Sequence, residues 1–468
     1  MVGDQPLPSS TTDDDGTMRP PIESLSFDIL SQIFLDCLPE TGLASVSTAD
    51  APVLLGRICR HWRAIALGTP QLWAGLDFGH GAERALGDQT KDAMAAAEWK
   101  NRAGSCSLSY RLWLTHDGVL DVILQYCSQW RHFEARIEAD GWNKVYTVVS
   151  KGAPRLRYLA IEILNPPHIH IDIPIPGASQ LQSLHIGMDF IIHFKLDHMV
   201  TPSLKMLDCE RSPLSLDDCW SCLRYFPNLE HFSATCDNGH PLEFSSGIVE
   251  AKELKNLQLT LHRAGFDRLL DVIQARSLEN LEFNFHHTSD DLSIGVPPIP
   301  RFLERSGAHL VYIYIDAPMT SDQIIECFHH TPALTFLELH NGLLNDAVIQ
   351  ALTLVAGTET PCHNICPELE RIVFMQDRVN ASTLSSDVMK DMILSRWRGE
   401  VRQMVSSTDN IWERKLRSIS LICLDFEDFC VVTLERTIIR CVEEGLEVVE
   451  NHPDYYFAQH DQLHVSSE

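Results

Sequence analysis

Basic residues are scarce in this sequence: 37 Lys and Arg stand against 64 Asp and Glu, which leaves a formal net charge of −27. A field of that sign repels nucleic-acid phosphates and anionic lipid surfaces, so neither is an expected partner. Without about 18 consecutive apolar residues, no segment is expected to span a bilayer. The first twenty residues carry Asp13-Asp14-Asp15 and no apolar stretch, so we expect no secretory signal and a cytoplasmic or nuclear location.

Motifs of common enzymes are also missing, including the Gly-x-x-x-x-Gly-Lys phosphate loop, His-Glu-x-x-His and Gly-x-Ser-x-Gly. We therefore expect neither catalysis nor a cofactor. The 14 cysteines are scattered through apolar phrases, which is typical of buried, reduced thiols. Cys219 and Cys222 fall in one predicted helix. Cys362 and Cys366 are nearest to a ligand cluster, but zinc needs further converging ligands, so we expect no metal.

A leucine-rich phrase, Leu-x-x-Leu-x-Leu with some Ile, Phe, Ala or Cys in its later places, recurs along the chain. Its ten copies start at Leu156, Leu181, Leu204, Leu229, Leu254, Leu278, Leu310, Leu334, Leu369 and Leu416. Six of the nine intervals are 23 to 25 residues, within the window of about 20–29 expected for leucine-rich repeats. Helical stretches alternate with the phrases, notably at 216–225, 266–275, 321–330 and 345–354. The pattern predicts an α/β fold with a leucine-rich-repeat solenoid and curved parallel sheet over residues 108–450.

One face of that sheet is expected to bind a target protein. In each phrase the fourth and sixth residues point inward, so the third, the fifth and the residue after the phrase (the seventh) point to the open, concave face. Carboxylates outnumber cations there, which favours a target with a basic segment. Tyr312, Tyr314 and Phe336 lie on adjacent strands and are a candidate hot spot, although single aromatics are also common on exposed strands. The candidate target-binding residues are Tyr158, His185, Asp208, His231, Glu282, Tyr312, Tyr314, Phe336, Glu338 and Arg371.

Helical spacing dominates the beginning of the chain. Residues 1–20 are polar and predict a disordered tail. Apolar residues step by four from 24 to 38, which predicts a helix that Ser26 caps. A second helix is expected over 50–66, and Leu72 with Trp73 then adds an apolar anchor. A third is expected over 88–102.

The later intervals are less regular. Intervals of 32, 35 and 47 residues predict insertions near 297–300 and at 379–415. Residues 431–449 predict a closing helix with a weak point at Gly445, and 451–468 a polar tail.

Three phrases near the start occur in a familiar order: Leu25-Ser-Phe-Asp-Ile-Leu-Ser-Gln-Ile-Phe34, Ile58-Cys-Arg-His-Trp-Arg-Ala-Ile-Ala66 and Thr69-Pro-Gln-Leu-Trp73. Together they resemble an F-box, which usually has Pro at the place of Ser26 and Glu at that of Asp28. The segments at 99–108 and 130–134 are similar to phrases in the large F-box family of mushroom-forming fungi. The likeness covers about the first 135 residues. It divides the start of the chain into an F-box at 21–75 and a helical linker at 76–107.

The resemblance implies a function. An F-box docks on a Skp-type adaptor, which bridges to a cullin–RING ubiquitin ligase, while the carboxy-terminal region selects the target. At each of the matching positions a contact within the local core is as plausible as an adaptor contact, and Trp62 and Trp73 are expected as internal anchors. The adaptor-facing residues implied are Leu25, Ile29, Leu30, Ile33, Phe34, Leu54, Ile58, Cys59, Trp62 and Ile65.

Alternatives remain at this point. The basic residues Arg57, Arg60, His61 and Arg63 suit either an acidic adaptor or a solvated helix face. The F-box-like helices also suit a structural cap on a protein-binding scaffold, because terminal repeats need capping. An enzyme would need a pocket of converging perturbed groups, for which the sequence offers no candidate.

Overall fold

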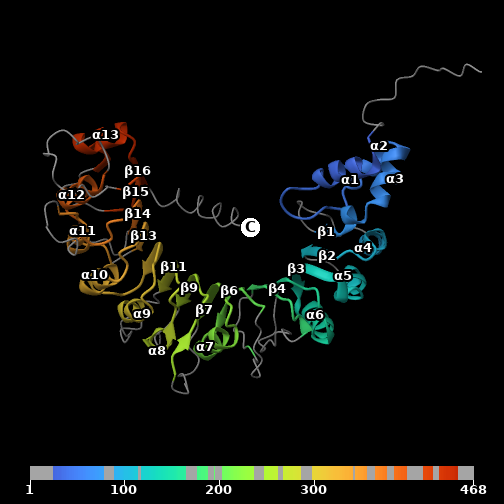
Figure 1. The fold of residues 1–468 in the computed structure, drawn as a ribbon, viewed down its shortest axis with the longest axis horizontal. Helices are drawn as coiled ribbons and strands as arrows, with labels where there is room; N and C mark the ends of the chain where they lie inside the picture. Colours follow the sequence, from blue (N-terminus) through green and yellow to red (C-terminus); the bar gives the residue numbers. More distant parts are fainter. Residues whose placement is uncertain are drawn as a thin grey trace, which may run out of the picture.

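The computed structural model describes residues 25–78, 89–113, 117–164, 177–187, 194, 203–236, 247–261, 267–285, 298–340, 343–355, 364–376, 384–397, 415–424 and 432–451. The tails expected at 1–20 and 451–468 lie outside these residues, apart from Asn451, which ends a strand. The described residues form an arc, with a sheet along its inner side and helices along its outer side (Figure 1). A helical head, residues 25–73, stands at one end.

Fourteen strands of the described residues form one parallel sheet, and its spatial order follows the sequence. The strands are β1 (Gly75–Phe78), β2 (Leu108–Trp113), β3 (Trp130–Glu138), β4 (Tyr158–Leu164), β5 (Ser183–Gly187), β6 (Met206–Leu214), β7 (His231–Cys236), β9 (Asn256–Leu261), β11 (Asn280–Phe285), β12 (Tyr312–Asp316), β13 (Phe336–His340), β14 (Arg371–Met375), β15 (Ser418–Ile422) and β16 (Glu447–Asn451). The short strands β8 (Val249–Glu250) and β10 (Ile273–Gln274) pair separately.

Helices make up the head and connect most of the strands. They are α1 (Phe27–Asp36), α2 (Leu55–Ile58), α3 (Arg60–Gly68), η2 (Pro70–Trp73), α4 (Gln89–Ala103), α5 (Asp117–Leu124), η3 (Cys127–Gln129), α6 (Ala139–Lys151), α7 (Leu216–Tyr225), α8 (Asp267–Asp271), α9 (Ile299–Ser306), α10 (Ser321–His329), α11 (Asp346–Ala351), α12 (Ser386–Arg396), η8 (Val432–Leu434) and α13 (Arg436–Glu443). From α5 to α12 they cover the outer, convex side of the sheet (Figure 1).

The leucine-rich phrases set the register of the sheet. All ten phrases form strands, and each strand begins at the third residue of its phrase. The first, fourth and sixth residues are at most 4% exposed in every copy, because they pack between the sheet and the outer helices. Equivalent residues pair across neighbouring strands, as Asn256 and Asn280 do. The third and fifth residues therefore form rows along the concave face, as predicted.

The sheet begins earlier and ends later than the phrases predict. β1 lies at the boundary between the expected F-box and the expected linker, so the sheet starts at Gly75 rather than at 108. Trp73, two residues before β1, and Trp130, the first residue of β3, occupy the place of the first leucine of a phrase, and both are buried. At the other end, the single helix expected over 431–449 is wrong. The left-handed φ of +107° at Gly445 ends the helical run, and β16 follows.

Several expected elements differ in extent. The helix expected over 50–66 is two helices, because Cys59 is extended and its Sγ accepts a hydrogen bond from the backbone of Trp62 at the start of α3. The segments predicted as insertions near 297–300 and at 379–415 contain α9 and α12. Only the first part of the helix expected at 266–275 is helical, as α8, and β10 follows it. The sequence pattern did not predict α6.

One continuous hydrophobic core joins the head to the sheet. It runs through the described residues from Leu30 in α1 to Leu446 before β16. The backbone N–H of Asp77 in β1 donates to the carbonyl oxygen of Ala44, so the head also covers the first edge of the sheet. No helix in the described ranges is both long and apolar enough to cross a membrane.

Candidate functional site

The helical head is organised around a small core of its own. The Oγ of Ser26 caps α1 by accepting a hydrogen bond from the N–H of Ile29, as predicted. Leu30 and Phe34 point inward and are fully buried. The ring of Trp62 lies against that of Phe34, with centroids 4.9 Å apart. These contacts fix which apolar residues of α1 are left on the outside.

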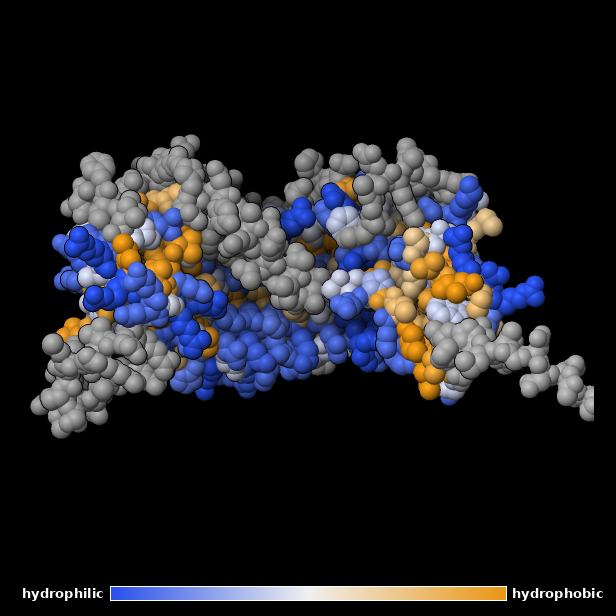
Figure 2. All heavy atoms as spheres, turned by 90° about the horizontal axis from the view of Figure 1, so that it is seen from above, coloured by the Kyte–Doolittle hydropathy of each residue, from blue (hydrophilic) through white to orange (hydrophobic). Residues whose placement is uncertain are grey.

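A second set of apolar side chains stays on the surface of the head. We call Phe27, Ile29, Ile33, Leu54, Ile58 and Leu67 the head patch; they are between 38% and 53% exposed. These six are a large share of the fourteen exposed large hydrophobic side chains found in the described residues. Figure 2, which looks into the arc, shows hydrophobic surface toward its two ends and hydrophilic surface along its middle.

The residues implied by the F-box resemblance divide between surface and core. Ile29, Ile33, Leu54, Ile58 and Cys59 are exposed. Leu30, Phe34 and Ile65 are buried and serve the packing of the head itself, while Leu25 and Trp62 are half-buried against the core. Phe27 and Leu67 were not predicted. A pattern match could not find them, because they stand at variable places of the motif.

Basic side chains accompany the head patch. Arg57, Arg60, His61 and Arg63 are all exposed on α2 and α3. The Nε of Arg63 donates to the carbonyl oxygen of Gly56 at 2.7 Å, which holds its stem against the surface of α2. The cluster is a local positive region in a strongly acidic chain.

The predicted target-binding residues lie on the concave side in the expected rows. Arg371 is exposed, and most of the others are half-buried between neighbouring strands. Glu338 corrects the prediction, since it is 1% exposed rather than open to solvent. The Nε2 of His340 lies 2.9 Å from its Oε1, and His340 is buried as well. The hydroxyl of Tyr312 donates to the other oxygen, Oε2, at 3.4 Å, so neighbouring side chains hold both oxygens of the carboxylate.

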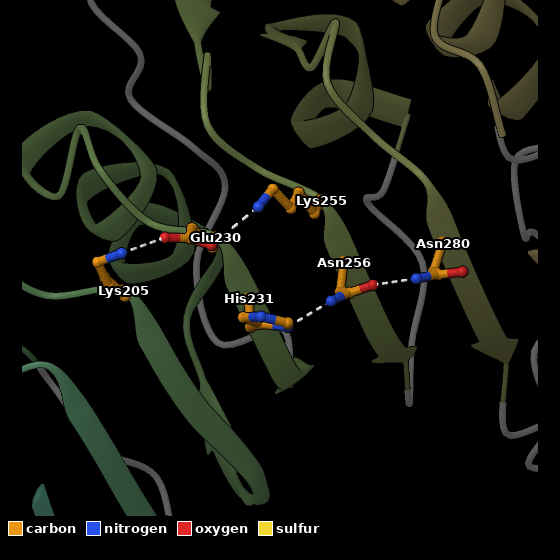
Figure 3. Close-up of polar contacts among 6 residues, drawn as sticks. All are labelled: Lys205, Glu230, His231, Lys255, Asn256 and Asn280. Carbon is orange, nitrogen blue, oxygen red and sulfur yellow. Dashed lines mark hydrogen bonds and ion pairs between the residues drawn. The ribbon is translucent and has the colours of Figure 1, made fainter. Parts of the chain in front are cut away.

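A ladder of amides crosses the middle of the concave face (Figure 3). The side-chain N–H of Asn280 donates to the Oδ1 of Asn256, whose own N–H donates to the Nδ1 of His231. Burial lowers the pKa of His231, and only a neutral imidazole can accept at Nδ1. This part of the face is therefore polar and uncharged.

Charged residues alternate just before β6, β7 and β9 (Figure 3). The Nζ of Lys205 lies 2.6 Å from one oxygen of Glu230, and the Nζ of Lys255 lies 3.1 Å from the other. These two hydrogen bonds lower the pKa of Glu230 to about 2. Each residue is the second of its phrase, so the repeat that builds the sheet also spaces the charges.

An aromatic and cationic stripe runs over β12, β13 and β14. The ring centroids of Tyr312 and Phe336 are 4.7 Å apart, and the guanidinium of Arg371 lies 4.4 Å from the centre of the Phe336 ring. Tyr314 packs edge-on against His340 at 4.7 Å. Of the three aromatics proposed as a hot spot, Tyr312 and Phe336 thus stack together with Arg371, whereas Tyr314 packs against His340. Tyr, Phe and Arg are residues in which the cores of protein interfaces are enriched.

An open hollow of about 220 Å³ lies over β4 and β5 in the half nearer the head. Among its lining residues are His185 and Asp208, which the sequence predicted, and Trp113, Arg136 and Arg211, which it did not. Trp113 and Arg136 belong to strands that lack the leucine phrase. Arg211 lies beyond the sixth residue of its phrase, so the repeat pattern gave no signal for it.

The cysteines predicted as buried thiols are mostly so. Burial raises the pKa of Cys209 and Cys222 well above the usual value. A 3.3 Å contact with Cys236 raises that of Cys219. Within the described ranges no group of His, Cys, Asp and Glu is arranged to hold a metal ion. Cys362 lies outside those ranges, so the pair that it forms with Cys366 in the sequence has no described geometry.

No protein-family model matches the sequence, and a search of the curated proteins gives no match either. What can be inferred about function therefore comes from the residues and their arrangement.

Proposed function

We propose that this protein is an F-box protein with a leucine-rich-repeat solenoid, which serves as the substrate-recognition subunit of a Skp–cullin–F-box type ubiquitin ligase. The head would bind a Skp-type adaptor and, through it, a cullin–RING ligase, while the concave face would bind a target protein. The observation that carries the proposal is the exposure of Ile29, Ile33, Leu54 and Ile58, at positions where the resemblance to an F-box implies adaptor contacts.

Energetics support a partner for the head patch. Each of its side chains is about half exposed, so covering one would gain about 1 kcal/mol. Several exposed apolar side chains gathered on one small helical unit are typical of a protein-binding surface. The exposed basic residues of α2 and α3 favour an acidic partner, because they form a local positive region in a chain whose net charge is −27.

The concave face supports the second half of the proposal. It offers an aromatic stripe, an uncharged amide ladder and a charged hollow along one curved surface, which suits an extended protein target more than a small molecule. Ligases of this type act in the cytoplasm or nucleus, and we propose that location. The free cysteines agree with a reducing compartment.

Co-expression of the full chain with a Skp-type adaptor tests the adaptor interaction. The wild-type chain should form a complex that survives size-exclusion chromatography at micromolar concentration. Ile29→Asp combined with Ile58→Asp should abolish the complex without unfolding the protein, because both side chains are about half exposed. Ile439→Asp is the matched control, since Ile439 is 39% exposed on α13 at the far end of the arc.

A scaffold whose head is only a cap is the second candidate. It is favoured by the way the head covers the first strand, through the bond from Asp77 N–H to Ala44 and the bridge from Ser45 to Asp77. The two candidates differ in one outcome. A chain that folds and stays monomeric beside the adaptor, with or without the two substitutions, would leave capping as the function of the head.

A further inference from the structure

The hollow on the concave face differs from the rest of that face in both shape and charge. Ala160 and Gly187 stand in the rows of β4 and β5, and their small size leaves the space open. Larger side chains from β2 and β3 border it on one side, and residues of β6 on the other. Its volume of about 220 Å³ is below the roughly 300–1,000 Å³ of small-molecule sites, which suits a single inserted side chain.

Carboxylates outnumber cations around this space. Four acids line it, Glu134, Glu162, Asp208 and Glu210, against two arginines. With His185 counted as neutral, the lining carries a formal charge of −2; Arg111, just outside it, pairs with Glu134 at 2.8 Å, so the acidic excess lies toward β6. An added anion would meet this excess at close range, whereas a cation would offset it.

The two arginines already face a common acid. Arg136 Nε and Arg211 Nη1 lie 3.5 Å and 3.6 Å from the same oxygen, Glu162 Oε1. These are loose ion pairs rather than hydrogen bonds, and Arg136 Nε has no hydrogen-bond partner. Their charge is nevertheless balanced in part by Glu162, so they do not make the hollow an anion site.

His185 and Trp113 add features that suit a cation. The Nδ1 of His185 lies 3.1 Å from Asp208 Oδ2, so in the neutral ring it carries the proton and Nε2 is left as an acceptor. That Nε2 is buried and has no hydrogen-bond partner. The ring of Trp113, which is 37% exposed, lines the same space and can pack against an alkyl stem or a cation.

We propose that this hollow binds one lysine or arginine side chain of a protein on the concave face, with its cationic end among Asp208, Glu210 and Glu162. The identification of that protein as a ligase target rests on the proposed function, but the chemistry of the hollow does not. The general attraction of an acidic chain for basic peptides would favour basic residues at every position. A built site favours them at one position.

Selection from a random peptide library on the immobilised full chain, at about 0.15 M salt, tests the inference. Wild type should select Lys or Arg at a single position, and a selected peptide should lose at least about tenfold in affinity when that residue becomes Ala. Gly187→Leu should remove the preference by filling the hollow. An added Cβ there would lie 3.7 Å from Glu162 Cγ, an ordinary contact, so the fold has room for it. Gly118→Leu on α5 is the control, because its added Cβ would meet nothing within 4 Å.

Asp208→Asn combined with Glu210→Gln gives an independent variant that leaves the space open. It should weaken the selected peptide by at least about tenfold, even if Gly187→Leu folds poorly. The inference would be overturned if wild type selected no preferred residue at any position or selected acidic residues. It would also be overturned if both hollow variants bound the selected peptide as tightly as wild type does. The selection uses the chain without adaptor, so a failure of adaptor binding would count against the proposed function alone.

Discussion

The Nη2 of Arg396, at the end of α12, donates a 2.7 Å hydrogen bond to the carbonyl oxygen of Ile365, in the segment that leads into β14. Its other nitrogens donate to Cys366 and Leu352, and the side chain is 1% exposed. Arg305 at the end of α9 bonds the carbonyl oxygens of Leu270 and Ile273 in the same manner. In both places an arginine in the last turn of an outer helix thus donates hydrogen bonds to backbone carbonyl oxygens of segments that lie earlier in the chain.

Arg396→Met should therefore destabilise the carboxy-terminal part of the arc. It leaves the carbonyl oxygens of Leu352 and Ile365 without a donor and that of Cys366 with only the N–H of Leu369, at a cost of about 2 kcal/mol or more in the free energy of unfolding. Burial lowers the pKa of Arg396 to about 10, which is still well above neutral, so the native group is charged. Hydrogen exchange of the β13–β15 amides and the urea midpoint would show the loss.

Arg417→Met is the control for this prediction. Arg417 is 69% exposed and pairs with Glu370 at 3.4 Å, so its removal should cost less than about 1 kcal/mol. Equal effects of the two substitutions would contradict a structural role for the buried guanidinium.

Glu230 should give the charged row a measurable acid dependence. Its pKa is lowered to about 2 in the folded protein by hydrogen bonds from Lys205 and Lys255. A carboxyl with a lowered folded pKa stabilises the fold above its unfolded pKa of about 4.5, and that contribution disappears as the pH falls toward 2. Both lysines are well exposed, so solvent screening limits the contribution to about 1 kcal/mol or less.

Glu230→Gln measures this contribution directly. The variant should be slightly less stable than wild type to urea at pH 7, and the difference should shrink as the pH falls below 4.5 and vanish only below about pH 2. Its hydrogen-exchange rates near β7 and β9 should follow the same trend. A difference that persists unchanged at low pH would assign the effect to packing rather than to charge.

The sequence predicted the parallel sheet because leucine placement reports burial directly. A residue at the first, fourth or sixth place must fit between the sheet and a helix, so its identity is constrained at every copy. The two strands of the large sheet that escaped prediction, β1 and β16, replace those leucines. Trp73 stands at the first place before β1, and Glu450 stands at the sixth place in β16. The spacing of the repeat is therefore kept in the structure even at strands where leucine is replaced by another residue type.

The candidate site was less predictable for a related reason. The place of a residue within the repeat decides whether it faces the concave side. His185, Asp208 and Tyr312 could therefore be placed on the concave face from sequence alone. The depth of each position depends on its neighbours across the sheet. Glu338 is buried although its place in the phrase predicts exposure, and the hollow lies where two small residues, Ala160 and Gly187, stand diagonally across the neighbouring strands β4 and β5. Burial and hollows that depend on the side chains of neighbouring strands cannot be predicted from a single phrase.

Trp73 should be the main attachment of the head to the arc. Its Nε1–H donates to the carbonyl oxygen of Ala66 at 2.8 Å, and its ring lies 4.8 Å from that of Trp99 and 4.2 Å from the guanidinium of Arg102. Trp73→Ala should cost about 3–5 kcal/mol by opening a cavity at this junction. Hydrogen exchange of α1 and α3 should rise more than that of β11–β15.

Trp73→Phe separates the ring from its hydrogen bond. It keeps an aromatic group at the junction and loses the donor to Ala66, so it should cost about 1–2 kcal/mol. If Phe and Ala were equally destabilising, the contacts with Trp99 and Arg102 would not be what holds the head in place.

Thiol labelling should distinguish the surface of the head from the core of the arc. Cys37 and Cys59 are exposed, whereas Cys209 and Cys222 are buried with raised pKa values. Because the thiolate is the reactive form, iodoacetamide at pH 7.5 should modify Cys37 and Cys59 within minutes and leave the buried pair intact until the protein is unfolded. Mass spectrometry of proteolytic fragments gives the order of modification, with the urea-unfolded chain as the control for complete labelling.

The same measurement reports on the proposed adaptor contact. Cys59 lies between Ile58 of the head patch and the start of α3, so a bound adaptor should slow its alkylation at least about tenfold. Ile29→Asp combined with Ile58→Asp should restore the fast rate in the presence of adaptor, because the complex no longer forms. Protection of Cys59 in that double variant would show that the adaptor approaches another face of the head.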